Sequence, residues 1–218
     1  MDKYTTIIFD LDGTLLNTLE DLKDSVNHVL SENGYEEKTL DEIRKAVGSG
    51  TKVLFERVLP YGSQNKDFQK IFDEYQVYYL EHCNDKTGPY DGIIETMAVL
   101  KDKGYKMAIV SNKPDAAVKE LRDKYFGDYL EVAIGDKEGR RRKPYPDSVI
   151  AAMEELHSSK DECVYVGDSD VDYQTALNSD LFCISCLWGF RTKEELEEAG
   201  ASFFIENPMD LVDVMNRF

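Results

Sequence analysis

The sequence predicts an α/β fold: a parallel sheet with helices on both faces, and an all-helical domain inserted after the first strand. Two observations support this prediction. From Tyr90 onward, short apolar runs alternate with helical periods, which favours a parallel sheet with right-handed crossovers. Residues 15–89, in contrast, show helical periods and no convincing strand. We therefore expect a core domain of residues 1–14 and 90–218 and a helical domain of residues 15–89.

Composition restricts the possible partners of the chain. Its 218 residues are 42% hydrophobic and 32% charged, as in soluble globular proteins. The net charge of −17 argues against nucleic acid, whose phosphates require a basic surface. No apolar run reaches the ~20 residues that span a bilayer, and the N-terminus lacks the regions of a signal peptide. We expect a cytoplasmic protein that binds neither nucleic acid nor membrane.

A cytoplasmic location predicts that the four cysteines are free thiols. Cys183 and Cys186 form a C-x-x-C pair, a pattern that can indicate redox or zinc chemistry. They lie in an apolar run that is typical of a strand, where residues three apart are about 10 Å apart and face opposite sides. Structural thiols are therefore the better interpretation.

The first strand is expected over residues 7–9, and two acids follow it directly. Asp10 and Asp12 are separated by one residue and precede Gly13-Thr14. An apolar run of this kind is typical of a buried central strand, and ligands gather beyond the carboxyl ends of such strands. The alternative is that the two acids only cap a turn, where Asp and Gly are common.

Apolar residues spaced by three and four predict helices throughout the inserted block. Breaks at Asn33-Gly34, Gly48-Ser49-Gly50 and Pro60-Tyr61-Gly62 separate these helices. We interpret the aromatic side chains of the last, tyrosine-rich helix as core rather than as substrate contacts. The expected helices cover residues 19–29, 40–47, 53–58 and 68–79.

The second part of the chain alternates between the two kinds of element. Its helices are expected over residues 93–100, 115–125, 147–156 and up to 178. Its strands are expected over residues 107–110, 131–134, 163–166 and 182–187, before a final strand and helix.

Polar residues that interrupt these strands fall at the same end of each one. In chain order, the groups are Asp10 with Asp12, Ser111 with Asn112, Lys143, and Asp168 with Asp172. Because the strands are parallel, these groups share one edge of the sheet, whereas chance would scatter them over both edges. The convergence is stronger evidence for a site than any single motif.

Each group alone has an ordinary explanation. Ser111-Asn112 could be a turn before Pro114, and Lys143 could belong to a solvated basic loop with the arginines at 140–142. We expect those arginines to be surface residues or to aid electrostatic steering of the substrate. Asp170, between the two later acids, is expected to face solvent or to cap the following helix.

Phosphoryl transfer is the chemistry that suits this set of residues. Clustered carboxylates without cysteine or histidine favour a hard cation, and Mg²⁺ prefers a few carboxylates with water and phosphate. A cation is needed because one like-charge pair at 4 Å is repelled by ~4 kcal/mol at an effective dielectric of 20. Mg²⁺ and Lys143 would reverse that repulsion.

The motifs resemble those of the haloacid dehalogenase superfamily of phosphohydrolases in order and spacing. Residues 10–14 are similar to its first motif, 110–113 to its second, Lys143-Pro144 to its third, and 166–169 with Asp172 to its fourth. The resemblance covers essentially the whole chain. It implies a Rossmann-like sheet and a helical cap inserted after the first motif.

The resemblance also implies a role for each residue of the site. Asp10 would be the nucleophile that forms an aspartyl-phosphate, and Asp12 the general acid and base. The acid at position 12 argues against dehalogenation, because displacing halide needs no proton donor. Mg²⁺ would be held by Asp10, the backbone carbonyl of Asp12 and Asp168, with Asp172 supporting. The phosphate would be held by Ser111, Asn112 and Lys143.

Weaker signals concern the substrate. Residues 47–57, Tyr90-Asp91-Gly92 and residues 188–191 resemble the phosphoglycolate phosphatase branch. The expected function is hydrolysis of a small phosphorylated metabolite, a phosphate monoester of the phosphoglycolate type, by a monomer or homodimer. Alternatives are a phosphomutase (β-phosphoglucomutase-like), a pyrophosphatase, a phosphonate hydrolase with Lys52 as Schiff base, and a non-enzymatic phosphate-ligand binding module.

Overall fold

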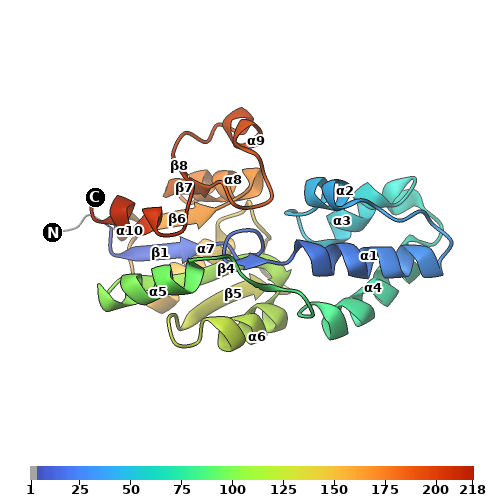
Figure 1. Cartoon of the computed structure of the whole chain (residues 1–218), viewed down its shortest axis with the longest axis horizontal. Coiled ribbons are helices and arrows are strands. Elements are labelled where there is room, and N and C mark those ends of the chain that lie inside the picture. The colour runs from blue at the N-terminus through green and yellow to red at the C-terminus, as the bar shows by residue number, and fades with distance from the viewer. Residues whose placement is uncertain (1–3) are drawn as a thin grey trace. The chain divides into compact units, whose positions relative to one another are not determined.

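The computed structural model describes residues 4–218, which fall into two compact units (Figure 1). One unit contains the chain up to Leu16 together with Pro89–Phe218, and the other contains Asn17–Gly88. Each boundary lies within two residues of the expected domain limit. The chain passes between the units at two strands, β2 (Leu16–Asn17) and β3 (Gly88–Pro89), which pair as a small two-stranded sheet. The sequence does not predict this sheet, because strands of two residues are too short to show an alternation of apolar and polar residues.

Six parallel strands form the sheet of the larger unit, in the order β5-β4-β1-β6-β7-β8. Their bounds are β1 (Thr6–Phe9), β4 (Lys106–Pro114), β5 (Val132–Asp136), β6 (Cys163–Gly167), β7 (Phe182–Cys186) and β8 (Phe204–Ile205). The chain leaves β1 toward β4 and β5 and later returns to β6 on the other side of β1. The strand order therefore reverses between β1 and β6, and open sheets bind ligands beyond the carboxyl ends of strands at such a reversal.

Strand β1 is buried because helices cover both faces of the sheet. Ile7 and Phe9 belong to one core with residues of α5, α6 and α10, and Ile8 belongs to the other with residues of α7 and α8. This is the two-residue alternation of a strand, and the predicted α/β fold is confirmed. The helices are α5 (Ile93–Asp102), α6 (Asp115–Tyr125), α7 (Asp147–Leu156), α8 (Asp170–Asn178), α9 (Lys193–Glu198) and α10 (Asp210–Met215), with the short η2 (Lys160–Glu162).

Strand β4 is longer than the predicted strand over 107–110. It continues through Pro114, which pairs with Asp136 after a register shift beyond Val110. Polar residues suggest a turn at this point, but Ser111 and Lys113 are buried strand residues. The turn interpretation of this segment is therefore wrong.

Helix α9 differs from the sequence prediction, whereas Asp170 agrees with one of its two expected roles. Helix α9 is not predicted, because Leu196 is its single buried residue and it therefore shows no apolar period. At the start of α8 the cap is Ser169, whose hydroxyl accepts a hydrogen bond from the backbone N–H of Asp172. Asp170 instead faces solvent and pairs with Arg191 at 3.1 Å.

The smaller unit is helical and has its own aromatic core. Phe55 and Tyr75 are fully buried, with ring centroids 4.7 Å apart, and Tyr75 stacks on Tyr79. The buried carboxylate of Asp21 accepts hydrogen bonds from backbone N–H groups near the end of the unit, including that of Thr87 at 2.8 Å. The elements are α1 (Leu19–Glu32), α2 (Leu40–Ala46), α3 (Thr51–Val58), η1 (Gly62–Gln64) and α4 (Phe68–His82).

All four cysteines are free thiols. Cys186 lies in one core of the sheet and Cys183 packs against the other, so they face opposite sides. Burial raises the pKa of the Cys183 thiol to about 12 and that of Cys163 to about 11, which keeps both thiols protonated at neutral pH. Within residues 4–218, no helix combines the length and apolar composition needed to cross a membrane.

Candidate active site

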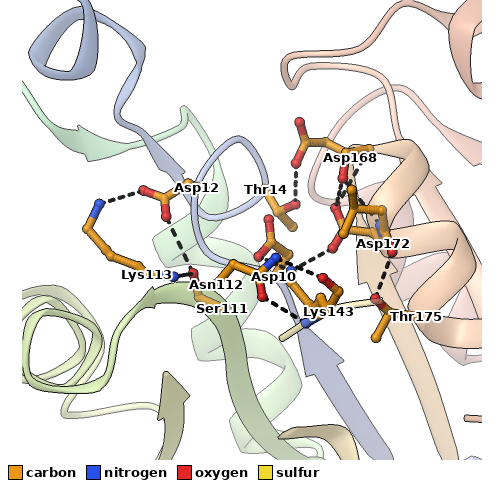
Figure 2. A network of polar contacts seen from close by, with 12 residues as sticks. Asp10, Asp12, Thr14, Ser111, Asn112, Lys113, Lys143, Asp168, Asp172 and Thr175 are labelled. Carbon is orange, nitrogen blue, oxygen red and sulfur yellow. Dashed lines mark hydrogen bonds and ion pairs between the residues drawn. The ribbon is translucent and has the colours of Figure 1, made fainter. Parts of the chain in front are cut away.

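Three buried carboxylates meet where the strand order reverses (Figure 2). Asp10 follows β1, Asp168 follows β6, and Asp172 lies in the first turn of α8. One oxygen of each lies within 4.8 Å of the others. The side chains of these three residues are almost inaccessible. The sequence predicts that these three acids lie at one edge of the sheet, and the structure brings them together there.

Glycines make room for this cluster. The backbone N–H of Asp10 donates to the Val166 carbonyl, which joins the end of β1 to β6. Gly13 has a φ of 96°, and a Cβ there would lie 2.4 Å from a carboxylate oxygen of Asp168. A Cβ at Gly189 would lie 2.5 Å from the same oxygen. The position of Asp168 therefore depends on two residues without side chains.

Asp168 is held by two donors but remains costly to ionise. Its oxygens accept hydrogen bonds from the Thr14 hydroxyl at 3.0 Å and from the Phe190 backbone N–H at 2.7 Å. Burial and the charge of Asp172 outweigh these contacts and raise the pKa of Asp168 to about 7. Burial and Asp172 also raise the pKa of Asp10 well above its usual range.

Lys143 reaches this cluster from the loop after β5. Its Nζ lies 2.5 Å from Asp10 Oδ1, 2.7 Å from Asp172 Oδ1 and 3.2 Å from the Tyr165 hydroxyl. Burial disfavours the charge on this amine, but the two carboxylates outweigh burial and raise its pKa well above normal. Lys143 is therefore a fixed cation in contact with Asp10.

The side chain of Asn112 positions Lys143. Its amide donates to the Lys143 carbonyl at 3.1 Å, and its carbonyl oxygen accepts from the Lys143 backbone N–H at 2.8 Å. Both ends of the amide are thus engaged with the backbone of the loop.

Asp12 lies apart from the acid cluster, beside β4 (Figure 2). Its Oδ1 is 3.0 Å from Lys113 Nζ, and its Oδ2 is 3.4 Å from the Ser111 hydroxyl. The carboxylate of Asp12 is therefore held next to Ser111, one of the predicted phosphate ligands.

The acid cluster fits a hard metal ion. When all three acids are ionised, the positive charge of Lys143 offsets only one of their negative charges, and buried charges require partners. The donors at hand are carboxylate oxygens of three residues, which suit a hard divalent cation rather than a soft one. Asp10 and Asp168 would hold the ion with Asp172 beside them, and the backbone carbonyl of Asp12 remains a predicted further ligand.

Comparison with known proteins decides the family. A family model described as haloacid dehalogenase-like hydrolase matches residues 7–186, a range that includes every acid and both lysines of the site described above. The chain belongs to this family.

Relatives of this haloacid dehalogenase-like hydrolase cover nearly its whole length. It is 31% identical to a phosphoglycolate phosphatase of Aquifex aeolicus, over 96% of both chains. It is 28% identical to the pyrophosphatase PpaX of Listeria welshimeri, over 98% of this chain and 97% of the relative. A crystal structure from Lactobacillus delbrueckii subsp. bulgaricus, with a provisional phosphoglycolate phosphatase assignment, has a TM-score of 0.94, 34% identity and 98% coverage of both chains.

These comparisons confirm the predicted family and the predicted class, an enzyme of the phosphatase type. Sequence reasoning missed three side chains of the site: Thr14, Lys113 and Tyr165. Thr14 and Lys113 lie inside the recognised motifs, and their positions beside acids were the available signal. Tyr165 sits in an apolar strand, where its hydroxyl gives no sign of a partner. The arginines at 140–142 are exposed or half-buried and contact neighbouring surface groups, as expected.

The raised pKa of Asp168 predicts how a metal affects stability. A carboxyl whose pKa is higher in the folded state stabilises the fold at low pH, and that contribution is lost as pH rises through the folded pKa, here about 7. In a chelator, Tm should therefore fall as pH rises from about 4, near the usual pKa of an aspartate, to about 7, so that the end of this fall lies between pH 6 and pH 8. Added Mg²⁺ should raise Tm by several degrees more at the higher pH, because it then binds without displacing a proton.

Thermal melts in chelator and in MgCl₂ at both pH values measure this effect. Asp168→Asn should remove most of the difference, whereas Asp170→Asn, an exposed neighbour, should retain it. An equal Mg²⁺ effect at both pH values would contradict the prediction.

Proposed function

We propose that the protein is a Mg²⁺-dependent phosphatase that hydrolyses a small phosphate monoester through an aspartyl-phosphate on Asp10. One observation carries the proposal: Asp10 lies at the end of β1 between a fixed ammonium, Lys143, and two further buried acids. This arrangement supplies a carboxylate nucleophile and positive charge at the same point. Both are required for attack on an anionic phosphate.

In the first step, an oxygen of Asp10 attacks phosphorus and the bond to the leaving oxygen breaks. Lys143, the Ser111 hydroxyl and the Asn112 backbone N–H are proposed to hold the phosphate oxygens. Without positive charge, an aspartate and a phosphate at 4 Å would repel each other by ~4 kcal/mol per charge pair at an effective dielectric of 20. Bound Mg²⁺ would supply further positive charge for the phosphate, next to Asp168 and Asp172.

Asp12 is proposed to act as the general acid and then as the general base. It gives a proton to the leaving alcohol as the ester bond breaks. It then takes a proton from water, whose oxygen attacks phosphorus and releases Asp10 and inorganic phosphate. The step returns Asp12 to its protonated form, so the cycle is balanced.

The relatives support phosphoglycolate as the substrate. Two of the similar proteins carry a phosphoglycolate phosphatase description. The similarity to PpaX favours pyrophosphate as a second candidate. We propose that the helical unit, Asn17–Gly88, is the cap domain that distinguishes such substrates.

The test is phosphate release from phosphoglycolate, pyrophosphate and several sugar phosphates, with and without Mg²⁺. We expect Mg²⁺-dependent release and a kcat/KM for phosphoglycolate at least about 10-fold above the sugar phosphates. A higher value for pyrophosphate would favour the second candidate. Absence of Mg²⁺-dependent release from every compound would contradict the proposed function.

A further inference from the structure

Lys113 is a buried lysine at the site that the reaction described above does not use. It lies on β4, two residues after Ser111, and its side chain is 4% exposed. Its Nζ contacts Asp12 Oδ1 at 3.0 Å (Figure 2). Burying an ammonium costs several kcal/mol, and its partner Asp12 is 21% exposed, so the pair adds little net stability. Its presence beside the proposed proton donor therefore suggests a role in placing that donor.

The contacts of Asp12 distinguish its two oxygens. Oδ1 is occupied by the ammonium of Lys113, whereas Oδ2 faces the Ser111 hydroxyl at 3.4 Å. The backbone N–H of Lys113 also donates to the Ser111 hydroxyl at 3.1 Å. Lys113 is thus bonded to both groups, and an ammonium can only donate. It leaves Oδ2 as the oxygen able to carry a proton, on the side of Ser111.

We propose that Lys113 is a positioning residue that fixes Asp12 with Oδ2 toward the leaving oxygen of the substrate. The inference rests on the proposed function, in which Asp12 is the general acid. A proton donor must lie within hydrogen-bond reach of its acceptor, and a carboxyl group without Lys113 would rotate among several orientations. Lys113 keeps its own proton throughout, and Asp12 Oδ2 gives its proton to the leaving oxygen as the ester bond breaks.

Substrates with different leaving groups test this role. Dinitrophenolate departs as a stable anion and needs no proton, whereas the alkoxide released from phosphoglycolate does. Lys113→Met keeps the length of the side chain and removes its charge. We expect this variant to lower kcat/KM for phosphoglycolate by about 100-fold, and for dinitrophenyl phosphate by less than about 3-fold. Because kcat/KM reports on the first phosphoryl transfer, the later hydrolysis of the intermediate does not mask the difference.

A double variant tests whether Lys113 acts through Asp12. In an Asp12→Asn background, adding Lys113→Met should change kcat/KM for phosphoglycolate by less than about 3-fold, because the proton donor is already absent. Lys160→Met is the matched control, since Lys160 forms an exposed pair with Asp180 at 3.2 Å; its activity should equal that of the unaltered enzyme. The Mg²⁺-induced shift in Tm checks that Lys113→Met leaves the acid cluster intact.

Two results would overturn the inference. One is an equal loss with both substrates, which indicates a general structural defect. The other is a further large loss in the Asp12→Asn background, which indicates direct contact of Lys113 with the substrate. Asp10→Asn separates these outcomes from failure of the proposed function. If this variant remains active, Asp10 is not the nucleophile and the proposed function fails. If it is inactive, only the role of Lys113 is in question.

Discussion

Asp10→Asn is expected to lower turnover of an aryl phosphate by at least about 10⁴-fold. The carboxamide has no anionic oxygen to attack phosphorus, while its size and shape are nearly unchanged. Asp10 is 6% exposed and contacts Lys143. An acid on the protein surface therefore cannot take its place as the nucleophile. Loss of activity on every substrate is therefore the expected result.

The same variant should be folded and no less stable at high pH. Because burial and Asp172 raise the pKa of Asp10, ionising this residue destabilises the metal-free protein as pH rises through that raised value. Asparagine cannot ionise, so the midpoint of urea unfolding at about pH 8 in chelator should not decrease. A stable but inactive variant would distinguish lost chemistry from lost structure.

Asp170→Asn provides the matched control for this experiment. It is the same substitution at the first residue of α8, an acid whose side chain is 52% exposed and pairs with Arg191. Its turnover should remain within about 2-fold of the unaltered enzyme, because the Asp170 carboxylate is half exposed and lies outside the cluster of buried acids. Activity of Asp10→Asn above one tenth of normal would refute the assignment of the nucleophile.

The acids of the site could be predicted because topology alone places them. Asp10 and Asp168 each follow an apolar strand, and parallel strands end at one edge whatever their exact register. Lys143 shares that edge because its loop follows β5. No side-chain geometry is needed for these inferences. They depend only on where strands stop.

The partners of these residues could not be predicted in the same way. The positions of Ser111 and Lys113 depend on β4 continuing to Pro114 after a register shift, and polar residues at a strand end suggest a turn instead. Tyr165 lies in an apolar strand and is therefore interpreted as a core residue. Its contact with Lys143 joins positions that are distant in the sequence, so no local pattern indicates it. Helix α9 had one available signal, the capping box of Thr192 and Glu195, but no apolar period.

Lys143→Met is expected to weaken phosphate binding and to destabilise the fold. Lys143 is the buried cation that contacts both Asp10 and Asp172. A hydrogen bond to a charged group contributes about 1.5–3 kcal/mol, so the Kd of vanadate or phosphate in Mg²⁺ should rise about 30-fold. Methionine fills a similar volume, which limits the effect to the lost charge and hydrogen bonds.

The loss of stability in this variant should depend on pH. The raised pKa of Lys143 means that its stabilising contribution is present at every pH below its usual value, so the amine itself does not titrate near neutrality. Asp168, whose pKa is about 7, does. At about pH 8 in chelator, removing the cation leaves the buried acid cluster without its positive partner, and we expect a loss of about 3–5 kcal/mol. The loss should be smaller near pH 5, where Asp168 binds a proton.

Urea unfolding at both pH values and vanadate titration together test the role of Lys143. Arg141→Met is the control from the same loop, because Arg141 is exposed and pairs with Asp147 at 2.8 Å. It should alter stability by less than about 1 kcal/mol and leave vanadate affinity unchanged. If Lys143→Met binds vanadate as tightly as the unaltered protein, Lys143 only balances the charge of the acids. A loss of vanadate affinity together with a pH-dependent loss of stability would show that the Lys143 ammonium both stabilises the fold and binds the phosphate.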